Sequence, residues 1–249
     1  MERTPTGIAG LDELLGGGLP RGRSTLVVGS PGSGKTILAI QFLRNGAMGD
    51  ERGLFVSLDE APLQIKENAA AFSWNLDELE REGKLFFVDA TPIRRATQRP
   101  VVDEDSPQDS RPLVLPQATL SRLMDTISRL VEEEGIQRIA VDPVTSITLR
   151  YDTNAERRRA VMLFFDRLNA TGCTSVITTE LRTSMLDRAF QIEEFLSQGV
   201  ILLHTVVHEG NVVRAIQIEK MRGISHDTQL RPYRINERGI EVFSKDRVF

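Results

Sequence analysis

The chain has 249 residues, of which 40% are hydrophobic and 27% charged, as is typical of a globular protein with one large domain. Its 31 Lys and Arg residues against 35 Asp and Glu give a net charge of −4, which argues against a surface that attracts polyanions as a whole. The sequence starts without an apolar signal core, no apolar run approaches about 18 residues, and Cys173 is the single cysteine. We therefore expect a cytoplasmic protein with no membrane span and no internal disulfide.

The first part of the chain predicts a phosphate-binding loop between a strand and a helix. A short helix is expected at residues 11–15 and a strand at residues 24–28. The strand leads into GSPGSGKT, which has the pattern Gly-x-x-x-x-Gly-Lys-Thr. A helix with apolar residues along one side follows the loop, and we expect it to end at Asn45 and Gly46.

The chemistry of this loop predicts a nucleoside triphosphate. Its glycines let consecutive backbone N–H groups curl around phosphates, and the helix N-terminus adds positive potential. Lys35 is expected to reach the β- and γ-phosphates, and the Thr36 hydroxyl to hold Mg²⁺. The predicted nucleotide contacts are Gly29, Ser30, Pro31, Gly32, Ser33, Gly34, Lys35, Thr36 and Ile37.

Further along the chain, strands and helices alternate, which predicts an α/β fold with a mostly parallel sheet. Buried strands are expected at residues 53–58, 85–88, 138–141 and 174–178, and amphipathic helices at 118–134 and 155–170. The pattern then changes to a predicted antiparallel hairpin and two short edge strands, at residues 200–207, 212–219, 230–235 and 240–243. We expect one domain over residues 1–249. The proline-rich residues 91–117 predict a mobile surface loop, with a partner-binding role as the alternative.

Carboxylates follow two of the predicted strands. Asp142 ends an apolar run, and an acid at the tip of the strand beside the phosphate loop can hold Mg²⁺ through water, the Walker B arrangement. The alternative is an aspartate that caps the next turn. Asp59 and Glu60 follow another strand at its carboxyl end, where open parallel sheets bind ligands, and one of them is suited to orient and deprotonate water. The same pair also suits the start of a helix at Pro62.

Two polar segments lie after the Walker B strand. Thr178, Thr179 and Glu180 end the next strand, where they either sense a γ-phosphate and pass its state to residues 181–198 or are simply solvated. The segment KMRGISH, residues 220–226, follows the predicted hairpin. Its basic residues suit either a surface charge cluster or arginine-finger-type groups that stabilise transition-state charge.

Six segments together resemble the KaiC-like branch of the RecA/RadA ATPase superfamily. They are TGIAGLDELLGGGLPRG, GSPGSGKTILAIQFLRNG, FVSLDE, IAVDPVTSI, VITTE and KMRGISH, and they cover nearly the whole chain in the right order. The last of these is more specific than any phosphate loop. The chain resembles one KaiC-type ATPase domain standing alone.

The resemblance implies a RecA-like core that binds ATP and Mg²⁺ at subunit interfaces of a ring, commonly a hexamer. In such rings the phosphate loop belongs to one subunit and the KMRGISH segment reaches the ATP of its neighbour. The residues implied by this segment are Lys220, Met221, Arg222, Ile224 and His226, with Lys220, Arg222 and His226 acting in trans. A further implication is that ATP regulates assembly or a protein partner. We find no clear acceptor motif and therefore do not predict autophosphorylation, which leaves kinase activity open.

One departure concerns the two glutamates that the family usually carries where this chain has Asp59 and Glu60. Asp59 is one methylene shorter, and a misplacement of about 1 Å can cost on the order of 100-fold in rate. Hydrolysis is therefore expected to be slow, or Glu60 to substitute. Our hypothesis is that Lys35 and Asp59 are catalytic, with Asp59 as the base and Glu60 supporting it.

Two other functions remain open. One is a nucleic-acid-binding recombinase paralogue that would use the loops at residues 148–159 and 182–188, with Tyr151 as their single aromatic. Positive charge there comes from Arg150, Arg157, Arg158, Arg159, Arg182 and Arg188. The other is a nucleotide-locked scaffold with negligible turnover, which fits Asp59 at the base position.

Overall fold

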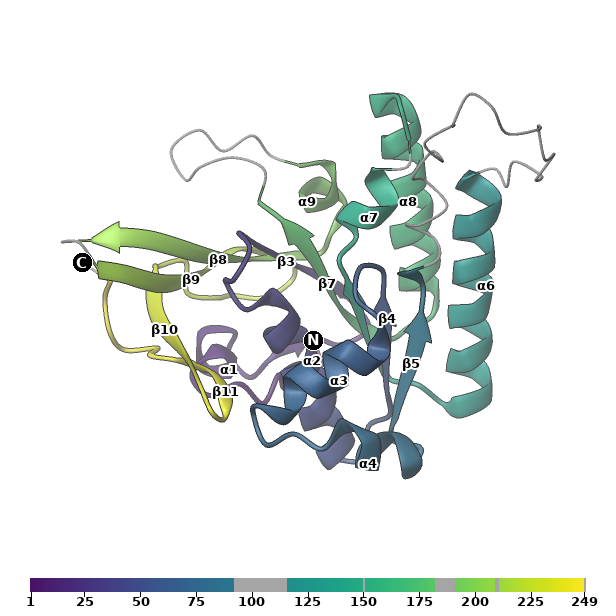
Figure 1. Ribbon diagram of the computed structural model, residues 1–249. Helices are drawn as coiled ribbons and strands as arrows, with labels where there is room; N and C mark the ends of the chain where they lie inside the picture. Colours follow the sequence, from purple (N-terminus) through teal and green to yellow (C-terminus); the bar gives the residue numbers. More distant parts are fainter. Residues whose placement is uncertain (92–115, 150, 182–190, 209–210, 249) are drawn as a thin grey trace, which may run out of the picture.

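The computed structural model describes residues 1–91, 116–149, 151–181, 191–208 and 211–248. At the centre of these ranges is a nine-stranded sheet (Figure 1). Its strands are β3 (Ser24–Gly29), β4 (Gly53–Ser57), β5 (Leu85–Asp89), β6 (Arg138–Asp142), β7 (Thr174–Glu180), β8 (Gly199–His208), β9 (Asn211–Met221), β10 (Arg231–Asn236) and β11 (Gly239–Val242).

The strand order is β11-β10-β9-β8-β3-β7-β6-β4-β5. The pairs from β8 to β5 are parallel, whereas β8, β9, β10 and β11 pair antiparallel. A separate two-stranded ribbon joins β1 (Arg3–Thr4) to β2 (Leu19–Pro20). The parallel sheet with an antiparallel C-terminal extension confirms the predicted α/β fold class, and the two short C-terminal strands extend the edge of this sheet as expected.

Helices cover both faces of the sheet (Figure 1). They are α1 (Leu11–Leu14), α2 (Lys35–Met48), α3 (Pro62–Ala70), α4 (Leu76–Arg81), α6 (Pro116–Glu134), α7 (Thr145–Thr148), α8 (Asn154–Ala170) and α9 (Ile192–Leu196). The strand β3 shows how the two layers form, because its side chains alternate between the faces. Val27 packs with Leu38 of α2 on one face, and Leu26 packs with Phe164 of α8 on the other.

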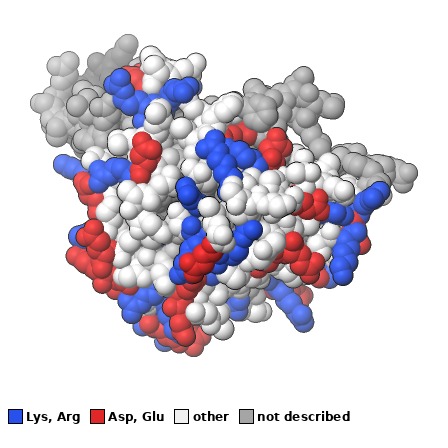
Figure 2. All heavy atoms as spheres, turned by 180° about the vertical axis from the view of Figure 1, so that it is seen from behind, with Lys and Arg blue, Asp and Glu red and all other residues white. Residues whose placement is uncertain are grey.

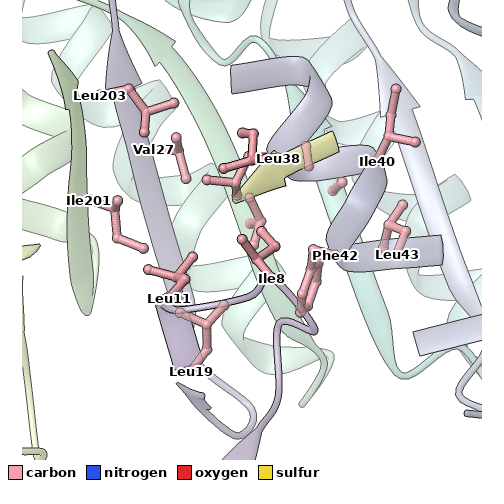
Figure 3. Close-up of a cluster of buried hydrophobic side chains, with 14 of the residues drawn as sticks. Ile8, Leu11, Leu19, Val27, Leu38, Ile40, Phe42, Leu43, Ile201 and Leu203 are labelled. Carbon is pink, nitrogen blue, oxygen red and sulfur yellow. The ribbon is translucent and has the colours of Figure 1, made fainter. Parts of the chain in front are cut away.

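The core on the α2 face is drawn in Figure 3. Val27 lies between Leu38 of α2 and the β8 side chains Ile201 and Leu203, and all four are almost fully buried. This packing fixes the N-terminus of α2 over the carboxyl end of β3. Burial of apolar surface stabilises such packing by roughly 25 cal/mol per Å² removed from water.

One expectation about the helix that follows the phosphate loop was wrong. The helix α2 does not end at Asn45 and Gly46 but continues to Met48. Gly46 is buried against the side chain of Arg138, so its missing Cβ serves close packing rather than helix termination. In the sheet, β7 lies between β6, which carries Asp142, and the phosphate-loop strand β3.

The predicted loop at residues 91–117 lies almost entirely outside the described residues, since the structure describes only its two ends, Thr91 and residues 116–117. None of the described helices combines the length and the apolarity that a membrane crossing requires.

Candidate functional site

The phosphate loop links the carboxyl end of β3 to the first turn of α2. Gly32 and Gly34 have φ values of 75° and 92°, a left-handed conformation that glycine adopts without strain. Lys35 folds back over the loop, and its Nζ donates to the carbonyl oxygens of Gly29 at 2.9 Å and Ser30 at 3.0 Å. The predicted strand, loop and helix are thus all present, with the lysine held at the mouth of the loop.

Thr36 and Asp142 meet at the same edge of the sheet. The Thr36 hydroxyl donates to Oδ2 of Asp142 at 2.7 Å, and the Thr178 hydroxyl of β7 donates to its Oδ1. Although β7 separates β6 from β3, Thr36 still reaches Asp142 because α2 packs across the face of the sheet over β6. The structure therefore brings together the two predicted metal ligands.

Burial governs the ionisation of this cluster. Asp142 is 9% exposed, and desolvation raises its pKa, although hydrogen bonds from Thr178 and Thr36 and the charge of Lys35 act in the opposite direction. Burial lowers the pKa of Lys35, while the carboxylates of Asp142 and Glu180 oppose that shift. The charges of Lys35 and Asp142 thus stabilise each other against the desolvation that both side chains undergo.

The donor set fits a magnesium ion. A hydroxyl and a carboxylate oxygen 2.7 Å apart are hard oxygen ligands of the kind that Mg²⁺ prefers, and Mg²⁺ in nucleotide sites needs only one or two protein ligands besides water and phosphate oxygens. Within the described ranges, no cluster of three or more His, Cys, Asp and Glu suggests a different metal site.

Asp59 and Glu60 lie just beyond the carboxyl end of β4, next to the cluster. Ser57 is the register partner of Asp142, and the Leu58 amide donates to the Asp142 carbonyl at 2.8 Å. Both acidic side chains are exposed. Glu60 lines a cavity of about 210 Å³ together with Thr36, and the Ser57 hydroxyl donates to the Glu60 carbonyl oxygen. The helix α3 begins at Pro62 after Ala61 as its N-cap, and no acidic residue lies in its first turn, so the pair precedes this helix rather than starting it.

The end of β7 is tied into a polar network. The Thr145 hydroxyl, from α7, lies 3.1 Å from the Thr179 hydroxyl and accepts from the Glu180 amide at 3.2 Å. Gln191, which precedes α9, donates through Nε2 to the Glu180 carbonyl at 2.7 Å. Glu180 is therefore held beside Lys35 by its backbone, while its side chain is exposed.

The KMRGISH segment lies elsewhere in the same chain. Lys220 donates to the Glu194 carbonyl of α9, and Arg222 donates to the Phe195 carbonyl at 3.3 Å. Burial lowers the pKa of Lys220, and the nearby charge of Arg222 adds to this shift. Met221 is only 4% exposed and packs into the core of its own chain. In the structure, the basic side chains of Lys220 and Arg222 are thus hydrogen-bonded to carbonyl groups of α9.

Of the two remaining residues singled out in the KMRGISH segment, Ile224 faces the core and His226 faces an open cavity. Ile224 is partly buried against the core on the α2 face. His226 lies 3.4 Å, through Nδ1, from the Ile224 carbonyl oxygen, and it lines an open cavity of about 460 Å³ near α1. Neither contact brings these residues to the phosphate loop of the same chain.

The residues proposed for a nucleic-acid interface are poorly suited to stacking. Tyr151 is 6% exposed and packs in the core formed with α6 and α8, which leaves no free ring face for a base. Arg157 donates to the Tyr151 carbonyl at 2.8 Å, whereas Arg158 and Arg159 are exposed on α8. On the face shown in Figure 2, Lys and Arg are interspersed with Asp and Glu rather than joined in one basic field. Arg150, Arg182 and Arg188 lie outside the described residues.

Three residues near the site carry contacts that the sequence patterns did not predict. Thr145 and Gln191 support the end of β7, and Tyr233 of β10 contacts the phosphate loop itself. Thr145 carried a weak signal, since it follows the Walker B aspartate closely in sequence. Gln191 lies within residues 181–198, the segment expected to respond to the end of β7, although no pattern singled it out. Tyr233 carried no signal, because it reaches the loop from 200 residues further along the chain.

Comparison with known proteins agrees with this geometry. A protein-family model described as "ATPase: KaiC" matches residues 4–247. The chain is 38% identical over 240 residues to the circadian clock oscillator protein KaiC of Synechococcus elongatus, covering 96% of the chain and 43% of that relative. It is 37% identical over 245 residues to KaiC of Parasynechococcus marenigrum, and 36% identical over 245 residues to KaiC of Prochlorococcus marinus. These two matches cover 98% of the chain and 45% and 46% of the relatives.

The chain therefore spans just under half the length of the curated relatives that it matches. The family match extends over nearly all of its residues and includes the phosphate loop, Asp142 and the KMRGISH segment. On this evidence, the chain belongs to the KaiC ATPase family.

Proposed function

We propose that the chain binds ATP with Mg²⁺ at the carboxyl edge of its parallel strands and hydrolyses it, as a subunit of a ring with nucleotides at the interfaces. A hexamer is the ring size that the family resemblance favours. The observation that carries the proposal is the convergence of Lys35, Thr36 and Asp142 beside a glycine-rich loop whose backbone is suited to cradle phosphates.

Within one chain, Lys35 is proposed to bind the phosphates, and Thr36 and Asp142 to bind the metal ion. Lys35 is held by two loop carbonyls, so its ammonium group is already at the loop when phosphate oxygens arrive to replace them. Thr36 and Asp142 would hold Mg²⁺, which when bound would supply positive charge that offsets the negative charge of the phosphates. Thr178 orients the Asp142 carboxylate so that its second oxygen faces Thr36.

Proton transfer is assigned to the acidic pair after β4. Asp59 is proposed to orient the attacking water and accept its proton, with Glu60 in a supporting role. The position of Ser57 opposite Asp142 supports this assignment, because it places both acids at the edge where the γ-phosphate would lie. Glu60 shares a cavity with Thr36, which makes it the direct competitor for the role of base.

A site shared between subunits is supported by the strand register. Gly29, at the start of the loop, pairs with Leu203 of β8, whereas Lys220 pairs with Val200. These positions are about 10 Å apart along β8, with the loop and the KMRGISH segment extending away from each other. Within one chain they cannot hold the same phosphates, so Lys220, Arg222 and His226 are proposed to act on the nucleotide of a neighbour.

The biological output is proposed at the level of the family. The relatives are named circadian clock oscillator proteins, and they are about twice as long as this chain. We propose that ATP turnover in the cytoplasm controls assembly of this chain or its contact with a protein partner. Nucleic-acid binding is less favoured because Tyr151 is buried.

ATP hydrolysis per subunit, measured against protein concentration, tests the proposal. We expect specific activity to rise and then saturate as subunits associate, and Lys35→Ala to remove it at every concentration. Activity that stays at the level of Lys35→Ala throughout would contradict hydrolysis and leave a nucleotide-locked scaffold. Activity that does not change down to concentrations where sedimentation shows only monomers would contradict the shared site.

A further inference from the structure

The C-terminal strands contact the phosphate loop directly. Tyr233 of β10 is 4% exposed, and its hydroxyl donates to the Ser33 carbonyl oxygen at 2.6 Å. Burial raises the pKa of this phenol, against an opposing effect of Arg214, so the hydroxyl keeps its proton and remains a donor. The Tyr233 side chain, from a strand near the edge of the sheet, thus forms a hydrogen bond with the backbone of the phosphate loop.

Two further contacts fix β10 and β11 against the loop and α2. A Cβ on Gly34, whose φ is 92°, would come within 2.8 Å of the Ile235 Cδ1, so the loop backbone lies against β10. Gln41 of α2 donates to the Ile240 carbonyl at 3.2 Å and accepts from the Ile240 amide at 2.8 Å. The strand that carries Tyr233 is therefore anchored independently of the phenol.

The geometry of the peptide unit gives this contact a consequence for phosphate binding. Among the described residues, the one cis peptide bond is Asp142–Pro143, so the bond between Ser33 and Gly34 is trans. In a trans peptide the C=O and N–H groups point in opposite directions. When Tyr233 holds the Ser33 carbonyl toward β10, the Gly34 amide is directed away from β10, into the loop.

We infer that Tyr233 is a positioning residue for the phosphate-binding loop, which sets the Gly34 amide in the orientation that a nucleotide phosphate needs. This inference rests on the proposed function. It assigns to β10, in the antiparallel extension, a role in the nucleotide affinity of its own chain. The phenol acts through the loop backbone and takes no part in the reaction itself.

The test compares two buried hydroxyls. Tyr233→Phe removes the one that holds the loop. Thr4→Val is the matched control. The Thr4 hydroxyl is also buried and lies 2.9 Å from the Thr174 hydroxyl. This contact is at the amino-terminal end of the parallel strands, away from the phosphate loop. Binding of ADP with Mg²⁺ is measured by calorimetry, and exchange of backbone amide hydrogens in residues 29–36 is measured without nucleotide.

We expect Tyr233→Phe to raise the Kd for ADP by roughly 3- to 10-fold, the range for losing one neutral hydrogen bond. Exchange in the loop should be faster in this variant and unchanged in Thr4→Val. Wild-type affinity together with wild-type exchange in Tyr233→Phe would overturn the inference and leave the proposed function standing. Equal losses in both variants would also overturn it, because they indicate general destabilisation. If the unaltered chain binds no ADP, the proposed function fails, and loop exchange alone decides whether Tyr233 holds the loop.

Discussion

At the scale of single residues, the centre of the site is the oppositely charged pair Lys35 and Asp142. Burial disfavours the charged form of each side chain. Desolvation raises the pKa of Asp142 and lowers that of Lys35, and each shift is opposed by the charge of the other residue. Removing one partner would leave a buried charge without compensation, which is more costly than losing a surface ion pair. For this reason the acids outside the cluster, which are exposed, are the better residues for separating catalysis from folding.

Asp59→Asn and Glu60→Gln address the identity of the base. Both side chains are exposed, so neither substitution removes core packing. We expect Asp59→Asn to lower kcat by about 100-fold, the usual contribution of a general base, and Glu60→Gln to lower it by much less. Steady-state hydrolysis at saturating ATP and Mg²⁺ gives kcat, and ADP affinity should stay the same in both variants.

The reverse order would contradict the assignment of Asp59. Turnover that survives in Asp59→Asn but is lost in Glu60→Gln would make Glu60 the base. That outcome would agree with the cavity that Glu60 shares with Thr36. A loss of ADP affinity in either variant would show that the side chain also serves binding.

At the scale of elements, Gly46 allows α2 and β6 to pack closely, because a Cβ at this position would meet the side chain of Arg138. Arg138 is 5% exposed, and its Nε donates to Glu51 at 2.6 Å. Its Nη1 donates to the carbonyls of Pro5 and Phe42 at 2.9 and 3.0 Å, and the guanidinium lies 4.8 Å from the Phe42 ring centroid. A side chain with this many partners cannot move aside for a Cβ at Gly46, which would collide with it.

Gly46→Ala is therefore expected to destabilise the protein, although helix propensity alone predicts a gain of about 1 kcal/mol. Overpacking of this kind typically costs about 1–3 kcal/mol. The midpoint of urea denaturation measures the effect. Gly49→Ala is the control, because Gly49 has a φ of −102° and a Cβ there would meet only ordinary contacts. A Gly46→Ala protein as stable as the control would mean that Arg138 is free to move.

The same elements show how far a sequence can predict this fold and site. The phosphate loop, Thr36 and Asp142 were predictable because each is contiguous with a strand whose apolar pattern is clear. The order of β3, β7 and β6 was not, since sequence order does not determine which parallel strands pair. The roles of Gly46 and Tyr233 were not predictable either, because their partners, Arg138 and Ser33, are far away in sequence and a glycine or a tyrosine has many local uses.

At the scale of the whole molecule, the two groups of residues proposed to contact nucleotide are separated along the sheet. Lys220 and Arg222 bind carbonyls of α9, and the phosphate loop lies toward the other end of β8. If the nucleotide is shared between subunits as proposed, the interface would be heterologous, and it would close into a ring if the rotation allows it. Each active site would then be lost through a substitution on either side of the interface.

Mixing two inactive variants tests this sharing. One variant combines Asp59→Asn with Glu60→Gln, and the other is Arg222→Ala. With random assembly of equal amounts, about a quarter of the interfaces join an intact acidic pair to an intact Arg222, so hydrolysis should return to roughly that fraction of the unaltered rate. A mixture of Lys220→Ala with Arg222→Ala is the matched control, because no interface in it has both basic residues. If the first mixture is no more active than its two components measured separately, Arg222 acts within its own chain or not at all.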